Sequence, residues 1–231
     1  MRLVIFDCDG TLVDSQHMIV KAMEMTFAEM GYGVPDRDAV RSIIGLSLPE
    51  AMQSLRPDES DSQIDLMVDA YRTAFFELRS QSDDAQPLFE GAAAALRQLA
   101  AEDGVVLGIA TGKSRRGVKN LCERYGFDSY FATIQTADDA PSKPHPAMID
   151  QAMHETGIDA SQTMMIGDTV FDVAMARNAD VKAVGVTWGY HPARDLKDAG
   201  AHWLCSNFPE VLNVISMFRE NQDAHRNDKK R

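Results

Sequence analysis

The second half of the chain alternates short apolar segments with helical patterns, and this alternation limits its possible folds most strongly. Helical patterns lie at residues 116–125, 146–156 and 170–177. They separate apolar runs at residues 105–111, 131–135, 163–168, 182–187 and, more briefly, 201–204. Apolar strands rich in valine and isoleucine, separated by helices, are typical of βαβ units with a parallel sheet buried on both faces. We therefore predict an α/β fold.

The beginning of the chain is an apolar segment that ends in two acids, RLVIFDCDGTLVD at residues 2–14. Residues 3–6 predict one more buried strand of the same sheet. Asp7 and Asp9 follow it closely, and burying two such charges is costly unless a partner compensates. Because DG is a common turn dipeptide, this segment alone fits a polar turn as well as it fits a functional site.

Residues 16–85 differ from the rest because they contain no convincing strand. A helix within 58–80 is indicated by apolar side chains at spacings of four and three, which share one helical face. Further helices are expected at 17–30, from the N-cap Asp36 to residue 44, and at 50–55. The residues on the shared face of the 58–80 helix are Ile64, Val68, Tyr71, Phe75 and Leu78.

These patterns predict how the chain is divided. We expect a core made of residues 1–15 and 86–218, interrupted by a helical domain at 16–85. The polar segment 219–231, which ends in Lys229, Lys230 and Arg231, is expected to be disordered. The methionines of the 17–30 helix favour soft core packing, although the same helix is a candidate for a homodimer surface.

Charge and composition exclude several classes of partner. The net charge of −12 disfavours nucleic acid, because phosphate backbones require a basic surface. No apolar run approaches the roughly 18 residues that a membrane span requires. The three cysteines are far apart and form no CxxC pair. They predict reduced thiols and a cytoplasmic location, and they argue against a zinc site.

Polar residues lie where the expected strands end, which is where ligands bind in parallel α/β sheets. We expect four acids, a threonine and a lysine to converge in one crevice. The acids can lie together if they hold a divalent cation, with the lysine as a further positive charge. The last acid also suits the first turn of a helix for electrostatic reasons alone. These residues are Asp7, Asp9, Thr111, Lys143, Asp168 and Asp172.

Magnesium matches this ligand set best, because it is a hard ion that takes few carboxylates and adds water and phosphate oxygens. Asp7 and Asp168 are the expected direct ligands, and Asp9 would offer its backbone carbonyl. Asp172 lies one helical turn past Asp168 and can reach the same place. A carboxylate can also attack phosphorus. Asp7 would then form an aspartyl-phosphate, while Asp9 protonates the leaving oxygen and later deprotonates water.

Four short motifs occur in order along the chain: DCDGT at 7–11, ATG at 110–112, SKPHP at 142–146 and GDTVFD at 167–172. Together they resemble the four motifs of the haloacid dehalogenase (HAD) superfamily, and the helices after the first motif resemble the cap of its subfamily I. The resemblance implies a Rossmann-like core with an inserted helical cap. It also implies a nucleophile at Asp7, an acid/base at Asp9, and Mg²⁺ at Asp168 and Asp172. Phosphoryl binding would fall to Thr111, Gly112 and Lys143.

Within that superfamily, the segment IGLSLPEA at 44–51 is similar to the phosphoglycolate phosphatase-like branch. β-Phosphoglucomutases usually carry an arginine in the corresponding loop, and residues 45–49 have none. We therefore expect a Mg²⁺-dependent phosphomonoester hydrolase that acts on a small phosphorylated metabolite. Two alternatives are a β-phosphoglucomutase-like phosphotransferase and a non-enzymatic phospho-receiver. Receivers, however, are shorter and lack the helical insert.

Several residues carry weaker expectations. Lys113 is either solvent-facing or near the phosphate site, and His17, just past the start of the helical segment, is a candidate substrate contact. We expect His145 to shape its loop or to lie on the surface, and Trp188 and Trp203 to be packing residues. The patterns do not distinguish phosphoglycolate, a sugar phosphate, a nucleotide or pyrophosphate as the substrate.

Overall fold

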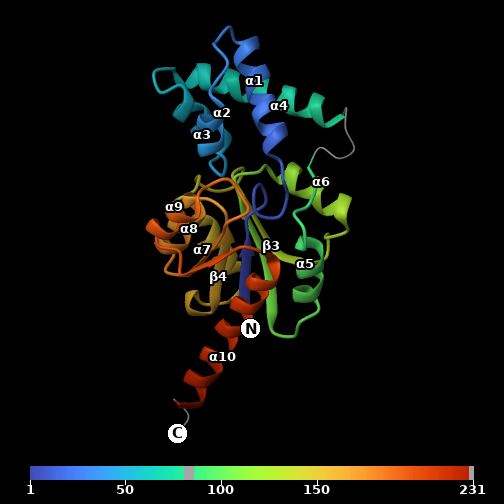
Figure 1. Cartoon of the computed structure of the whole chain (residues 1–231), viewed down its shortest axis with the longest axis vertical. Coiled ribbons are helices and arrows are strands. Elements are labelled where there is room, and N and C mark those ends of the chain that lie inside the picture. Colours follow the sequence, from blue (N-terminus) through green and yellow to red (C-terminus); the bar gives the residue numbers. More distant parts are fainter. Residues whose placement is uncertain (81–85, 229–231) are drawn as a thin grey trace.

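The computed structural model describes residues 1–80 and 86–228, and its centre is one sheet of six parallel strands (Figure 1). The strand order is β3-β2-β1-β4-β5-β6. Strands β2 and β3 therefore lie on one side of β1, and β4, β5 and β6 lie on the other side. Such a switch point opens a crevice at the carboxyl ends of the strands. The strands are β1 (Arg2–Phe6), β2 (Val105–Thr111), β3 (Phe131–Thr136), β4 (Thr163–Gly167), β5 (Lys182–Val186) and β6 (Trp203–Cys205).

Helices cover both faces of the sheet. On β1, Val4 and Phe6 point into one hydrophobic cluster while Leu3 and Ile5 point into the other, as the two-residue period of a strand requires. All four side chains are fully buried. The first cluster is covered by α5 (Ala92–Ala100), α6 (Arg115–Tyr125) and α10 (Phe208–Asp228), and the second by α7 (Ala147–Thr156), α8 (Val170–Asn178) and α9 (Ala193–Asp198).

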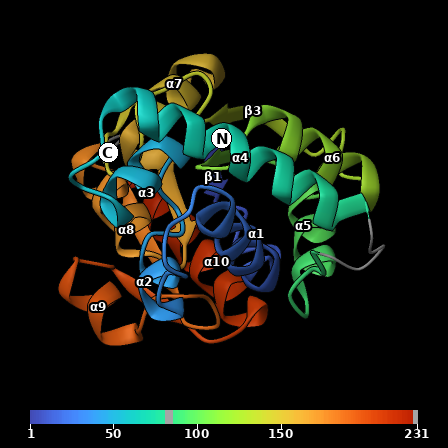
Figure 2. The ribbon, with the colours of Figure 1, turned by 90° about the horizontal axis from the view of Figure 1, so that it is seen from above.

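Four further helices form a layer over the carboxyl ends of the strands, seen from the side in Figure 1 and from above in Figure 2. We call residues 16–80 the helical insertion. It has its own hydrophobic cluster, which includes Met23, Met52 and Met67. Met23 belongs to the 17–30 helix, whose methionines were expected to pack in the core, and it is buried. The helices are α1 (Gln16–Glu29), α2 (Arg37–Ser42), α3 (Leu48–Leu55) and α4 (Asp61–Ser80).

The predicted α/β fold with inserted helices is therefore confirmed. The exact domain limits stay a prediction, and the expected cap limit at residue 85 lies outside the described residues. The expected N-cap is present: the Asp36 carboxylate accepts hydrogen bonds from the amides of Asp38 and Ala39, both at 3.1 Å. No helix in the described part of the chain is long and apolar enough to cross a membrane.

Three helices were missing from the expectations. Helix α5 has the sequence AAAALRQLA, whose alanines give little contrast between apolar and polar faces. Helix α9 has only six residues and one buried side chain, Leu196.

Helix α10 corrects the expected disordered tail, because its backbone stays helical through residues 219–228. This stretch has no glycine or proline to end a helix that its buried first half has already nucleated. Residues 229–231, with the basic cluster, lie outside the described residues.

Candidate active site

Three aspartates from separate segments meet at the carboxyl edge of the sheet. Asp7 directly follows β1, Asp168 follows β4, and Asp172 lies in the first turn of α8. One carboxylate oxygen of each lies within 4.8 Å of the others. The parallel pairing of β1 with β4 positions them, and it continues to the Asp7 amide, which donates to the Ile166 carbonyl at 2.9 Å. The predicted convergence of these acids is therefore present in the fold.

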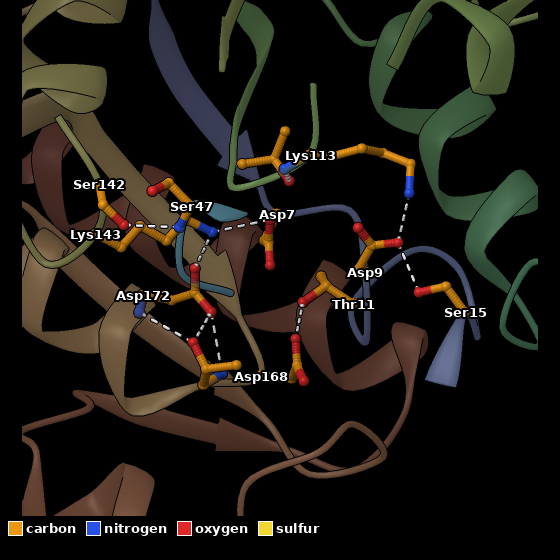
Figure 3. A network of polar contacts seen from close by, with 12 residues as sticks. Asp7, Asp9, Thr11, Ser15, Ser47, Lys113, Ser142, Lys143, Asp168 and Asp172 are labelled. Atoms are coloured by element: carbon orange, nitrogen blue, oxygen red, sulfur yellow. Dashed lines mark hydrogen bonds and ion pairs between the residues drawn. The ribbon is translucent and has the colours of Figure 1, made fainter. Parts of the chain in front are cut away.

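Lys143 lies between two of these acids (Figure 3). Its Nζ is 2.9 Å from Asp7 Oδ1 and 2.6 Å from Asp172 Oδ1, and its side chain is fully buried. Burial disfavours the charged amine, but Asp172 and Asp7 outweigh burial and raise the pKa of Lys143. When all groups are ionised, three carboxylates and one ammonium group leave two negative charges uncompensated.

Asp7 retains an unpaired oxygen. Its Oδ2 is buried and makes no hydrogen bond with any residue that the structure describes. Burial raises the pKa of Asp7 to about 6, against the opposing effect of Lys143. Buried polar atoms are nearly always paired, so this oxygen indicates a missing partner. The surplus negative charge and the hard oxygen donors fit a divalent cation such as Mg²⁺.

Asp168 is held by the backbone around it. Its Oδ1 accepts from Thr11 Oγ1 at 2.8 Å and its Oδ2 from the Tyr190 amide at 2.9 Å. A Cβ atom at Gly10 or at Gly189 would lie only 2.2 Å from Asp168. Gly10 also has a φ of 85°, in the left-handed region that favours glycine. Burial, then Asp172 and Asp7, raise the pKa of Asp168 well above its usual range.

Asp172 is both a helix-capping residue and a site residue. Its Oδ2 accepts from the Thr169 amide at 3.0 Å and from Thr169 Oγ1 at 2.7 Å. Thr169 Oγ1 also receives the Asp172 amide, which completes a capping box at the start of α8. This arrangement leaves Oδ1 facing Lys143. Asp172 can therefore both favour the first turn of α8 and face the site, the two interpretations that its sequence position allowed.

Asp9 makes different contacts from the three buried acids. Its Oδ1 accepts from Ser15 Oγ at 2.6 Å and from Lys113 Nζ at 2.7 Å (Figure 3). The Lys113 side chain is only 8% exposed, so it lies beside Asp9 and is not solvent-facing. A Cβ atom at Gly117 would lie 2.8 Å from Lys113 Cγ, so a side chain at residue 117 would collide with the lysine.

Ser15 and Tyr190 are site residues that the sequence analysis missed. The Tyr190 hydroxyl accepts a hydrogen bond from the Ser15 amide at 3.1 Å, and it lies 3.3 Å from Ser15 Oγ. Tyr190 thereby connects the residue that holds Asp9 with the backbone that holds Asp168. A signal was available, because the sequence WGY at 188–190 follows the end of β5, another strand end.

A loop of the helical insertion contacts the sheet edge directly. A Cβ atom at Gly112 would lie 2.5 Å from the Leu46 carbonyl oxygen, so only glycine permits this approach. The Ser47 amide donates to Ser142 Oγ at 2.7 Å, next to Lys143. Thr111 Oγ1 accepts from the Lys113 amide at 3.3 Å. The loop therefore lies beside the expected phosphate-binding residues.

A cavity of about 700 Å³ lies between the helical insertion and the sheet edge. His17 is exposed and is not among the described residues that line it. His145 is also exposed, and its Nδ1 accepts from the Ala147 amide. Trp188 packs on Phe208. Trp203 packs against the hydrophobic cluster that contains Phe208, on one face of the sheet. The sheet side of the cavity is lined by Asp7, Asp9, Thr111, Gly112 and Lys113, and the α4 side by Tyr71, Arg72, Phe75, Phe76 and Arg79.

Comparison with known proteins agrees with this geometry. Residues 4–186 match the family described as haloacid dehalogenase-like hydrolase. The chain is 39% identical to a protein named probable phosphatase IndB from Dickeya dadantii, over 92% of each chain. It is 26% identical to a phosphoglycolate phosphatase from Vibrio parahaemolyticus, over 94% of this chain and 97% of that one. A solved structure of a predicted phosphatase from Clostridium acetobutylicum superposes with a TM-score of 0.83 at 26% identity, covering 94% and 98% of the two chains.

The chain therefore belongs to the haloacid dehalogenase-like hydrolases. The family resemblance drawn from the four motifs is confirmed, and so is the prediction that the chain is a hydrolytic enzyme. Its relatives include proteins named as phosphatases. The roles of the individual site residues and the identity of the metal stay predictions.

Proposed function

We propose that this protein is a Mg²⁺-dependent phosphomonoester hydrolase that acts on a small phosphorylated metabolite through an aspartyl-phosphate on Asp7. One observation carries the proposal. Asp7 is buried with an Oδ2 that no described residue hydrogen-bonds, while Asp9 lines the same cavity with its carboxylate held by Ser15 and Lys113. A nucleophile and an acid/base two residues apart are what an aspartyl-phosphate mechanism needs.

The first step transfers the phosphoryl group to Asp7. A carboxylate oxygen of Asp7 forms a bond to phosphorus, and the bond from phosphorus to the ester oxygen breaks. The protonated Asp9 gives its proton to that oxygen, so the leaving group departs as a neutral alcohol. Ser15 and Lys113, both bonded to Asp9 Oδ1, hold the carboxyl in place for this transfer.

The second step releases phosphate. Asp9, now a carboxylate, takes a proton from water, and the water oxygen bonds to phosphorus while the bond to Asp7 breaks. The products are inorganic phosphate and the free Asp7 carboxylate, and Asp9 has regained its proton. The sum of the two steps is the hydrolysis of one ester bond by one water molecule.

The phosphoryl charge needs positive partners throughout. Lys143, Thr111 and the backbone amide of Gly112 would bind the phosphoryl oxygens. Asp7, Asp168 and Asp172 would hold Mg²⁺ through their side chains, and Asp9 through its backbone carbonyl. When bound, Mg²⁺ supplies charge that stabilises the transferring phosphoryl group. The helical insertion would exclude bulk water and contact the leaving group.

We place the enzyme in the cytoplasm, because its three cysteines are free and buried, as in a reducing compartment. The loop at 45–49, which contains no arginine, favours a hydrolase over a mutase.

Phosphate release from a panel of phosphomonoesters, with Mg²⁺ and with EDTA, tests the proposal. We expect release only with Mg²⁺, and none from the Asp7→Asn variant when circular dichroism shows it to be folded. Release that is unaffected by EDTA would reject the metal requirement. Stable labelling by a phosphodonor without release would favour a receiver, and bisphosphate-dependent isomerisation of a sugar phosphate would favour a mutase.

A further inference from the structure

The cavity is larger than a phosphoryl group and a two-carbon acid require. Its volume of about 700 Å³ lies within the range typical of sites for drug-sized ligands. Lys113 lies between Asp9 and helix α4. Its Nζ is 2.7 Å from Asp9 Oδ1 and 5.9 Å from the centre of the Phe75 ring. A leaving group protonated by Asp9 would therefore lie close to helix α4.

Helix α4 presents an aromatic wall at this position. The rings of Tyr71 and Phe75 are stacked with centroids 5.8 Å apart, and both line the cavity. Ile64 and Met67, in the first half of the helix, are buried in the hydrophobic cluster of the insertion, and Tyr71 and Phe75 pack against that cluster while staying partly exposed. Tyr71 and Phe75 thus lie between the buried cluster and the cavity. The two aromatic rings are therefore placed to contact a ligand.

The Tyr71 hydroxyl adds a donor to this wall. It makes no hydrogen bond with any residue in the described part of the chain. Burial, and then the Asp9 carboxylate, raise the pKa of Tyr71, so the phenol keeps its proton. An amphipathic ring of this kind suits a ligand that is apolar in its body and polar at one edge.

Two arginine side chains lie at the same cavity. Arg79 and Arg116 line it, and neither makes an ion pair with a residue that the structure describes. The Arg116 guanidinium is 5.7 Å from the centre of the Phe76 ring, which keeps it beside α4. One acid, Asp138, also lines the cavity, and its carboxylate accepts a hydrogen bond from the Arg115 amide at 2.8 Å. In a chain of net charge −12, this local positive region would attract an anionic group.

The lining contributed by α1 and by residues 43–51 is apolar except for Ser47, whereas Ser114 and Asn120 line the α6 side of the cavity. The loop and helix opposite contribute Ile19, Met23, Ile44 and Leu46. A site for a sugar would instead need several hydrogen-bonding side chains to satisfy its hydroxyl groups. The insertion side of the cavity thus fits a ring better than a polyol.

From these walls we propose that the leaving group of the substrate is a planar aromatic body that carries its own anionic substituent. This inference rests on the proposed hydrolase function and deepens it. The phosphate would lie at Asp7, the ring against Phe75 and Tyr71, and the anionic substituent at Arg79 and Arg116.

Four esters separate these features: 4-carboxybenzyl phosphate, benzyl phosphate, phosphoglycolate and glycerol phosphate. All four leave as alcohols, so differences in kcat/KM report binding of the leaving group more than chemical reactivity. We expect kcat/KM for 4-carboxybenzyl phosphate to exceed that for benzyl phosphate by about tenfold, from a charge-assisted contact. We expect benzyl phosphate to exceed glycerol phosphate by a similar factor, from contact with the aromatic rings.

Variants assign these preferences to residues. Phe75→Leu should remove most of the advantage of benzyl over glycerol phosphate, while Phe75→Tyr should keep it. The double variant Arg79→Gln with Arg116→Gln should remove the advantage of the carboxylate, so that kcat/KM for 4-carboxybenzyl phosphate falls to about the value for benzyl phosphate. Arg97→Gln is the matched control, because Arg97 is exposed on α5 and does not line the cavity.

The outcomes distinguish the two proposals. Mg²⁺-dependent release that is fastest for phosphoglycolate or glycerol phosphate would overturn the inference and leave the hydrolase function standing. No release from any of the four esters by the folded protein with Mg²⁺ would overturn both. Equal loss of all four activities in Phe75→Leu would show that Phe75 acts through the fold, which also overturns its assigned role.

Discussion

The sheet edge and the helical insertion meet at one cavity but are built differently. At the sheet edge, Asp7, Lys143 and Asp168 are at most 2% exposed, and each has a charged or hydrogen-bonded partner. On the insertion, Phe76 is 60% exposed and Arg79 has no ion pair with any described residue. Interlocked buried groups hold one geometry, whereas half-exposed side chains can change without disturbing the core. This difference suits chemistry on the sheet and substrate choice on the insertion.

The two regions are connected through few direct polar contacts near the reacting atoms. The Ser47 amide reaches Ser142, and the Leu46 carbonyl oxygen approaches Gly112. Both contacts come from one loop and lie next to expected phosphate-binding residues. Changes at the sheet edge, in the metal site and in this loop should therefore have effects of decreasing size.

The largest effect is expected from Asp7→Asn. The amide is close in size to the carboxylate but is not a nucleophile, so kcat should fall by at least about a thousandfold. The fold should survive, because a neutral group in this buried place avoids the cost of burying a charge. Steady-state kinetics measures the loss, and circular dichroism and thermal unfolding serve as controls. A folded variant with substantial turnover would exclude Asp7 as the nucleophile.

Metal binding should give the next largest effect, on stability. Mg²⁺ neutralises a buried acidic cluster, so at about 100 times its Kd it should stabilise the protein by about 2.7 kcal/mol. The expected result is a higher Tm with Mg²⁺ than with EDTA. Asp168→Asn should lose most of this shift but still fold, because its side-chain oxygen can accept from the Tyr190 amide. An equal shift in both proteins would place the metal elsewhere.

Most of the sheet could be predicted from the sequence, because its strands and their acidic ends are local patterns. Asp7, Asp168 and Asp172 were found in this way. The partners of Asp9 were harder to find, since Lys113 is 104 residues away from it in the chain. Contacts of this kind depend on how neighbouring strands align, which the whole core determines.

The contact between Ser15 and Tyr190 could not be predicted from local sequence patterns, for the same reason. The two residues are 175 positions apart, and they meet because the residue just before α1 lies beside the loop that follows β5. The orientation of the helical insertion is likewise a property of its few contacts with the sheet edge. A motif can identify the loop at 44–51 but not the residues it touches.

A moderate effect is expected from Gly112→Ala. The added Cβ would lie 2.5 Å from the Leu46 carbonyl oxygen and 2.7 Å from that of Gly45, both rigid backbone atoms. The loop must therefore shift, and kcat/KM should fall by about tenfold to a hundredfold through misplacement of the site. Gly33→Ala is the control, because nothing lies within 4 Å of its added Cβ. Equal activity of both variants would show that the loop does not approach Gly112 in solution.

The smallest effect is expected from Ser142→Ala, which tests the connection between the two regions directly. It removes the acceptor of the 2.7 Å hydrogen bond from the Ser47 amide, a net loss of about 1 kcal/mol. The loop should open more often while the sheet edge stays intact. KM should therefore rise a few-fold with kcat nearly unchanged, and hydrogen exchange at the Ser47 amide should become faster. Ser54→Ala, at an exposed serine of α3, should change neither. A fall in kcat without faster exchange would instead mean that Ser142 acts on Lys143, so that the two regions are less separate than their packing indicates.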